Sequence, residues 1–220
     1  MSAAASRSSR RPVPAAQRRV AAARRRTVRR RRIGLLALVA IAAAIAAAVV
    51  LPNVHKAVDA IRLPLRHEDI IRQQADQKGI DPALIAGVIY AESHFRDGQV
   101  SAAGAQGLMQ LTPQTARYIA RKSGGVAFKI DDLGTPQVNI AYGAYYLRYL
   151  MKRYGDNENF ALAAYNGGEG NVDRWIAKAR AKDEALTIDA IPFAETRAYV
   201  TKVQDAQAEY RRTYRRELGL

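Results

Sequence analysis

A glutamate lies at the end of an apolar helical stripe in this sequence. Residues 83–95 read ALIAGVIYAESHF, and Ile85, Val88, Ile89 and Glu92 fall at i, i+3, i+4 and i+7 on one helix face. Because a helix buries its apolar face, we expect the Glu92 carboxyl to lose water and its pKa to rise. A carboxyl that stays protonated near neutral pH can act as a general acid. Helical phase alone favours a plainer interpretation, in which Glu92 pairs with a basic residue or lies in solvent.

The rest of the sequence offers few other reactive groups. Its 220 residues include no cysteine, which excludes disulfides, thiolate metal sites and cysteine nucleophiles. Asp97 lies five residues past Glu92 and would face another side of a continued helix, while Asp131 and Asp132 fall in a predicted loop. Metal binding by that aspartate pair has no further support. We therefore predict no metal, no cofactor and a single working carboxyl.

Glu92 is accompanied by short segments in a fixed order. Each segment alone has an ordinary interpretation as a turn, a piece of core or a helix end. The segments are Glu92–Ser93, SAAGAQGLMQLTP at 101–113, AYNGG at 164–168 and ETRAYV at 195–200. In this order and spacing they resemble the lytic transglycosylases of the soluble-transglycosylase type, which have a goose-lysozyme-like catalytic domain. The resemblance covers about residues 70–203 and includes NIAYG at 139–143.

The resemblance implies an all-α, lysozyme-like fold and a role for each matching residue. Glu92 matches the family's sole catalytic residue. The other residues would bind substrate or support the site: Ser93 orients Glu92, Ser101 faces the acetamido group of the reacting sugar, Gln110 lines the sugar cleft, Tyr165 lies over the cleavage site with Asn166 beside it, Glu195 lies at the cleft edge, and Tyr199 packs beneath the site. Thr112 and Gly167 stand where the family often has an apolar residue and an alanine, which leaves the shape of one sugar subsite open.

The implied substrate is peptidoglycan, and the implied reaction needs only one carboxyl. Most glycosidases use two carboxylates. Here protonated Glu92 would donate to the oxygen between N-acetylmuramic acid and N-acetylglucosamine. The ionised Glu92 would then take the proton of the 6-hydroxyl of the same muramic acid, which closes a 1,6-anhydro ring without water. An intramolecular nucleophile gains from proximity.

Helical patterns fill the chain from residue 67 to residue 220, with room for one small hairpin and no internal repeat. One helix carries Ile70, Ile71 and Ala75 and ends at Gly79. Another begins at Asp81–Pro82, where Asp is a good N-cap and Pro suits the first turn. Further helices are predicted from about Pro113 past Ile119 and over 136–154, 159–165, 171–182 and 195–216.

The N-terminal part has a different composition. Residues 1–32 hold twelve of the 35 basic residues and no acidic residue, so the rest of the chain carries a net charge of only +3. We predict a disordered tail over 1–32. Residues 33–51 are uncharged and, as a helix, span roughly 28 Å, about the thickness of a bilayer core. The arginines before this run predict a cytoplasmic N-terminus, a linker over 52–66 and an extracytoplasmic catalytic domain over 67–220. Signal cleavage after Ala46–Ala47–Ala48 is the alternative, and the protein would then be secreted.

Three rival functions are weighed against the transglycosylase. A hydrolytic, lysozyme-like muramidase would share the fold and Glu92 and differ in the attacking group. A non-catalytic glycan-binding scaffold is disfavoured by the intact Glu92 and Gln110. Nucleic-acid binding through the arginine-rich tail is disfavoured because membrane topology and attraction to anionic lipid account for that tail. The expected partners are therefore glycan strands and the cell membrane.

Overall fold

The computed structural model describes residues 48, 62–124 and 127–220. The described elements are the helices α2 (Glu68–Lys78), α3 (Pro82–Ser93), α4 (Pro113–Ser123), α5 (Pro136–Arg153), α6 (Glu158–Gly167), α7 (Glu169–Arg180) and α8 (Ala194–Thr213), with the 3₁₀ turn η1 (Ile130–Gly134). The predicted all-α fold is therefore confirmed. In place of a hairpin, the segment between α3 and α4 has two isolated antiparallel bridges, Val100 with Gln106 and Gln106 with Leu111.

The predicted helix starts agree with the observed caps. The Asp81 side chain accepts a hydrogen bond of 2.9 Å from the Ala83 amide, and Pro82 occupies the first turn of α3. Thr112 caps α4 in the same way, accepting from the Thr115 amide at 3.1 Å. Such caps satisfy amides that have no partner inside the helix. The 3₁₀ turn η1 lies where a loop was expected.

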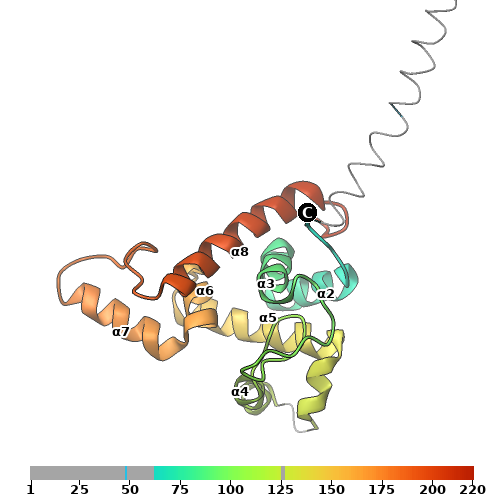
Figure 1. The fold of residues 1–220 in the computed structure, drawn as a ribbon, viewed down its shortest axis with the longest axis horizontal. Coiled ribbons are helices and arrows are strands. Elements are labelled where there is room, and N and C mark those ends of the chain that lie inside the picture. The colour runs from blue at the N-terminus through green and yellow to red at the C-terminus, as the bar shows by residue number, and fades with distance from the viewer. Residues whose placement is uncertain (1–47, 49–61, 125–126) are drawn as a thin grey trace, which may run out of the picture. The chain divides into compact units, whose positions relative to one another are not determined.

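The helix that carries Glu92 runs through the middle of the core. Residues 83–89 of α3 are all buried, so this helix is covered on every side and not only on its Ile85–Ile89 stripe. It packs against α2 and most extensively against α8, which also contacts α6 (Figure 1). A Cβ on Gly87 would come within 2.9 Å of the Val203 carbonyl oxygen, so only glycine allows α8 to lie this close. This contact sets how α8 is positioned along α3, beside Glu92.

Among the described residues, no helix is both long and apolar enough to cross a bilayer. The predicted tail over 1–32 lies outside those residues, as do the predicted apolar span over 33–51, apart from Ala48, and most of the predicted linker over 52–66.

Candidate active site

Glu92 occupies the last turn of α3, where two tyrosines and a lysine act on it. Its Oε1 accepts a hydrogen bond of 2.8 Å from the Tyr199 hydroxyl of α8. Burial raises the pKa of Glu92 to about 7, and the Tyr199 hydrogen bond and the charge of Lys202 oppose that rise. Burial disfavours the ionised form, while a donor and a cation favour it. Glu92 therefore has both protonation states within reach near neutral pH, whereas helical phase alone favoured a paired or solvent-exposed side chain.

Tyr165 belongs to the same site. It lies in α6, and the negative charge of Glu92 helps burial to raise the pKa of its phenol. The Tyr165 hydroxyl donates to the Met109 carbonyl at 2.9 Å. Its ring lies 5.5 Å from that of Tyr146 in α5. Tyr165 thus interacts with both Glu92 and the segment that follows α3, and its position over the cleavage site stays a prediction.

Ser101 lies in the middle of the loop between α3 and α4, and Gln110 lies near its C-terminal end. Ser101 Oγ accepts a hydrogen bond of 3.0 Å from the Ala105 amide, which tightens the turn at 101–105. Gln110 has a left-handed backbone, with φ of 44°. Its side-chain nitrogen Nε2 donates to the carbonyls of Gly107 at 2.8 Å and Gln99 at 3.1 Å. Both side chains are partly exposed. Each therefore shapes the loop and also remains open to a ligand.

Asn139 of α5 anchors this loop from beneath. The buried Asn139 amide accepts from the Met109 amide at 2.8 Å and donates to the carbonyls of Gln106 at 2.8 Å and Leu133 at 3.0 Å. A Cβ on Gly107 would lie 2.1 Å from Asn139 Nδ2, and φ at Gly107 is 76°, so glycine is required there. Asn139, in the family-like NIAYG segment, therefore positions the loop.

The other predicted site residues form hydrogen bonds with partners other than Glu92 or lie at an exposed position. Ser93 is buried, and its hydroxyl donates to the Ile89 carbonyl of the same helix at 3.2 Å. Asn166 accepts from the Thr196 hydroxyl at 2.8 Å. Glu195 is exposed in the first turn of α8. Their predicted roles toward the sugar stay predictions, whereas Tyr199, predicted only to pack, donates directly to Glu92.

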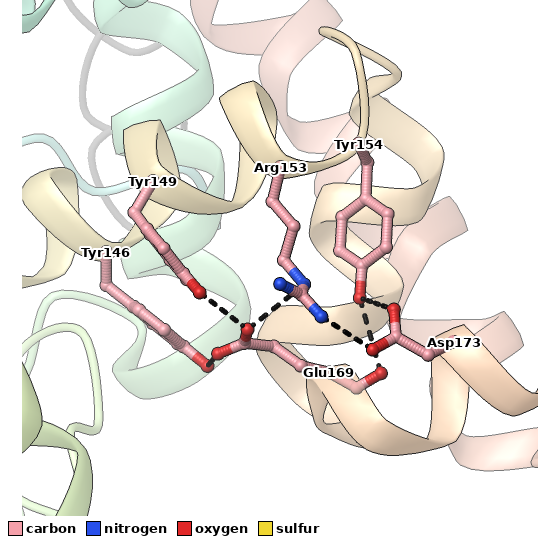
Figure 2. A network of polar contacts seen from close by, with 6 residues as sticks. All are labelled: Tyr146, Tyr149, Arg153, Tyr154, Glu169 and Asp173. Carbon is pink, nitrogen blue, oxygen red and sulfur yellow. Dashed lines mark hydrogen bonds and ion pairs between the residues drawn. The ribbon is translucent and has the colours of Figure 1, made fainter.

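Glu169 was not identified from the sequence, yet it is the centre of a polar network between α5 and α7 (Figure 2). Its carboxylate accepts from the hydroxyls of Tyr146 at 3.2 Å and Tyr149 at 3.0 Å and pairs with Arg153 at 3.2 Å. Arg153 also pairs with Asp173 of α7. The spacing of Tyr146, Tyr149 and Arg153 on one face of α5 was the available signal. The network holds Tyr146, and through its ring Tyr165, in place.

Two other acidic residues considered in the sequence, Asp97 and Asp132, have structural partners. Asp97 pairs with Arg66 and His67, and Asp132 accepts from the Lys129 amide at 2.8 Å. Among the described residues, Glu92 combines burial, a pKa of about 7 and a hydrogen bond from a phenol, and these surroundings suit proton transfer. The arrangement can protonate a leaving oxygen and later accept a proton.

Comparison with known proteins points the same way. The Transglycosylase SLT domain family matches residues 69–188. The soluble lytic murein transglycosylase of Salmonella typhimurium is 34% identical over 157 residues, which are 68% of this chain and 24% of that protein. Membrane-bound lytic murein transglycosylase C of Glaesserella parasuis is 34% identical over 167 residues, which are 66% of this chain and 46% of that protein.

A solved structure shares the fold. The X-ray structure of an inactive mutant of lytic transglycosylase Slt from Pseudomonas aeruginosa matches with a TM-score of 0.65 and 34% identity, over 71% of this chain and 25% of that chain. This chain thus spans about a quarter of the soluble relatives it matches. The matched residues include the whole of α3, with Glu92, and the loop and helices around it as far as α7. The chain belongs to the Transglycosylase SLT domain family.

Proposed function

We propose that this protein is a peptidoglycan lytic transglycosylase that cleaves between N-acetylmuramic acid and N-acetylglucosamine and leaves 1,6-anhydro ends. The observation that carries the proposal is the Glu92 carboxyl, which has a pKa of about 7 and a hydrogen bond from Tyr199. One group that must first give and then take a proton works best with a pKa near the operating pH. Relatives named as murein transglycosylases support this choice of substrate.

In the first step, protonated Glu92 donates to the glycosidic oxygen and the bond to the anomeric carbon breaks. The acetamido group of the muramic acid stabilises the cationic centre, with Ser101 facing it. In the second step, ionised Glu92 takes the proton of the 6-hydroxyl as that oxygen attacks the anomeric carbon. Tyr199 holds the carboxyl in both steps, and Tyr165, Gln110, Asn166 and Glu195 line the sugar cleft. Ser93 holds the end of α3.

The rival closest to this proposal is a hydrolytic muramidase with the same acid. In both reactions the ionised Glu92 takes a proton, from the 6-hydroxyl in one and from water in the other, so the mass of the products separates them. A non-catalytic glycan-binding scaffold is disfavoured because a binding surface gains nothing from a buried carboxyl of raised pKa. The Glu-to-Gln mutant of the Pseudomonas aeruginosa relative, described as inactive, also supports a catalytic glutamate.

We further propose that residues 33–51 anchor the protein in the cell membrane as a single span, with residues 1–32 in the cytoplasm and the catalytic domain outside. The support is the uncharged run of nineteen residues after an arginine block, and a relative named as membrane-bound. If the segment is cleaved as a signal, the same domain is secreted. Nucleic acid is not proposed as a partner.

The mass of the products tests the reaction. Purified peptidoglycan digested with the protein should yield sugar ends that are lighter by one water than hydrolysed ends. Hydrolysed ends alone would assign the muramidase reaction instead. Binding without release of fragments would assign the scaffold.

A further inference from the structure

We infer that Lys202 is a positioning residue of the reaction, whose ammonium group is held at the end of α3 to stabilise the ionised form of Glu92 between proton donation and proton return. This inference rests on the proposed function of Glu92. It concerns a residue that the sequence motifs did not single out.

The inference starts from a row of side chains on α8. Thr196, Tyr199 and Lys202 are spaced by three residues, so they follow one another along one side of the helix. Thr196 donates to Asn166 of α6 at 2.8 Å, and Tyr199 donates to Glu92 at 2.8 Å. Lys202 Nζ donates to the Ala91 carbonyl at 2.9 Å. This row therefore brings a hydroxyl and an ammonium group to two consecutive residues of α3.

The position of Lys202 is well determined by its neighbours. Its Nζ lies 5.8 Å from the centre of the Tyr90 ring, which is a cation–π geometry. The next residue, Val203, is fully buried and faces Gly87 at the closest approach of the two helices. Lys202 also lines a surface hollow of about 730 Å³ with Tyr90, Asp205 and Glu209. The ammonium group thus contacts α3 on one side and faces the surface hollow on the other.

The end of a helix is a poor place for a carboxylate. Carbonyls without helical partners give the last turn a partial negative charge, which opposes an ionised Glu92 just as burial does. By capping the Ala91 carbonyl, Lys202 offsets this charge one residue away from Glu92. Burial raises the pKa of Glu92 and the charge of Lys202 opposes that rise. Burial also lowers the pKa of His94, the C-cap of the same helix, and the charge of Lys202 adds to that fall.

The groups that interact with Glu92 come from two helices: Tyr199 and Lys202 lie on α8 and Tyr165 on α6. His94 follows Glu92 in the chain and is itself affected by Lys202 and Arg96. The two phenols have raised pKa values and stay neutral across the working range. Lys202 is therefore the cation whose removal should change the ionisation of Glu92, and His94 is the group that needs a control.

Three variants in the full chain separate charge from capping. Lys202→Met keeps the apolar stem but removes both charge and donor. Lys202→Gln keeps a donor for the Ala91 carbonyl but no charge, and Lys202→Arg keeps both. Lys152→Met on the exposed last turn of α5 is the matched control for loss of one positive charge. His94→Gln, alone and with Lys202→Gln, removes the histidine titration.

The first readout is the pH profile of kcat/KM on peptidoglycan. Because the protonated Glu92 is the active form of the free enzyme, activity falls as pH rises through its pKa. Lys202→Met and Lys202→Gln should both move this alkaline limb to higher pH, by on the order of half a pH unit or more. Their maximal rate should fall by on the order of tenfold, since the carboxylate formed in the first step is less stabilised. In Lys202→Arg and Lys152→Met the alkaline limb should stay at the same pH as in the unsubstituted protein.

The second readout does not depend on activity. The carboxyl ¹³C resonance of Glu92, assigned by its loss in Glu92→Gln, is titrated in the same proteins. A higher titration midpoint in Lys202→Gln, with Lys202→Arg unchanged, would support the inference even if the products proved to be hydrolysed. Equal midpoints in all the folded variants would overturn it and leave Lys202 as a cap only. A thermal melt identifies variants that fold, and if Lys202→Met does not, Lys202→Gln decides.

Discussion

Tyr199 donates a hydrogen bond of 2.8 Å to Glu92, although 107 residues of chain separate the two. The contact joins the last turn of α3 to the first turns of α8, the two helices that share the closest approach at Gly87. A phenol donor stabilises the ionised carboxyl more than the protonated one. The position of the Glu92 carboxyl is thus set by the packing of two helices and not by residues near it in sequence.

Tyr199→Phe tests this contact. The pKa of Glu92 should rise further, because the hydrogen bond that lowers it is lost while burial remains. We expect the alkaline limb of the activity profile to move to higher pH and the maximal rate to fall severalfold. The free energy of unfolding should change by only about 1 kcal/mol, the usual net value of one hydrogen bond. An unchanged profile in a folded Tyr199→Phe protein would show that the contact has no part in catalysis.

Tyr165→Phe and Ser101→Ala test the remainder of the cleavage site. The first removes the donor to the Met109 carbonyl and the second removes the acceptor for the Ala105 amide. Each should lower turnover on peptidoglycan while thermal melts show a folded protein. Thr201→Ala, an exposed change on α8, serves as a control. If both site variants keep the full rate, the sugar subsite lies elsewhere.

The network around Glu169 gives a prediction about positioning. Glu169→Gln keeps the size of the side chain but weakens its bonds to Tyr146, Tyr149 and Arg153. Hydrogen bonds to a charged group contribute about 1.5–3 kcal/mol, so unfolding should become easier by roughly that amount. KM for glycan strands should rise more than kcat falls, because Tyr146 packs against Tyr165 and has no hydrogen bond to the Glu92 carboxyl. Loss of kcat alone, with stability kept, would contradict this role.

Sequence patterns predicted the helix that carries Glu92 and the burial of its carboxyl, but not the residues that contact it. The stripe Ile85, Val88, Ile89 and Glu92 obeys helical periodicity, and Asp81–Pro82 marks where the helix begins, so local rules sufficed for α3. Tyr199 and Lys202 could not be assigned to Glu92 because their contacts depend on how α8 crosses α3. Gln110 adopts a left-handed backbone conformation that its residue type does not predict. Glu169 depends on three residues of another helix.

A topology prediction concerns the part of the chain ahead of the catalytic domain. A reporter enzyme that works only outside the cytoplasm, fused after Leu220, should be active, because the arginines before residue 33 hold the N-terminus inside. A cytoplasmic reporter at the same position should be silent. The opposite pattern would refute both the topology and the proposed substrate. Membrane fractions probed for the tail over 1–32 distinguish a retained anchor from a cleaved signal.

Glu92→Gln is the central test, since glutamine keeps the shape of the side chain but cannot lend a proton. General acid–base catalysis contributes roughly 10²–10⁴ in rate, and Glu92 serves in both steps, so release of anhydro-sugar fragments should fall at least that far. Glu184→Gln, at an exposed position, removes the same charge and should keep the rate.

The same pair of proteins has a pH signature in stability. The pKa of Glu92 is about 7 in the folded protein against 4.5 for the free side chain. The folded state therefore binds the Glu92 proton more tightly than the unfolded state does. The stability that this binding contributes is present at low pH and is lost as pH rises from 4.5 to 7. On the order of a few kcal/mol is involved. Glu92→Gln lacks this loss, because a neutral amide stays uncharged at every pH.

Chemical unfolding at pH 5 and at pH 8 measures the difference. Relative to the unchanged protein, Glu92→Gln should gain stability between pH 5 and pH 8, while Glu184→Gln should not. A salt bridge holding the fold predicts the reverse at pH 8, since breaking a buried pair costs about 3–5 kcal/mol. A Glu92→Gln protein that unfolds more easily at pH 8, yet still releases anhydro-sugar fragments at the original rate, would show that Glu92 is a structural residue and not the acid and base of the reaction.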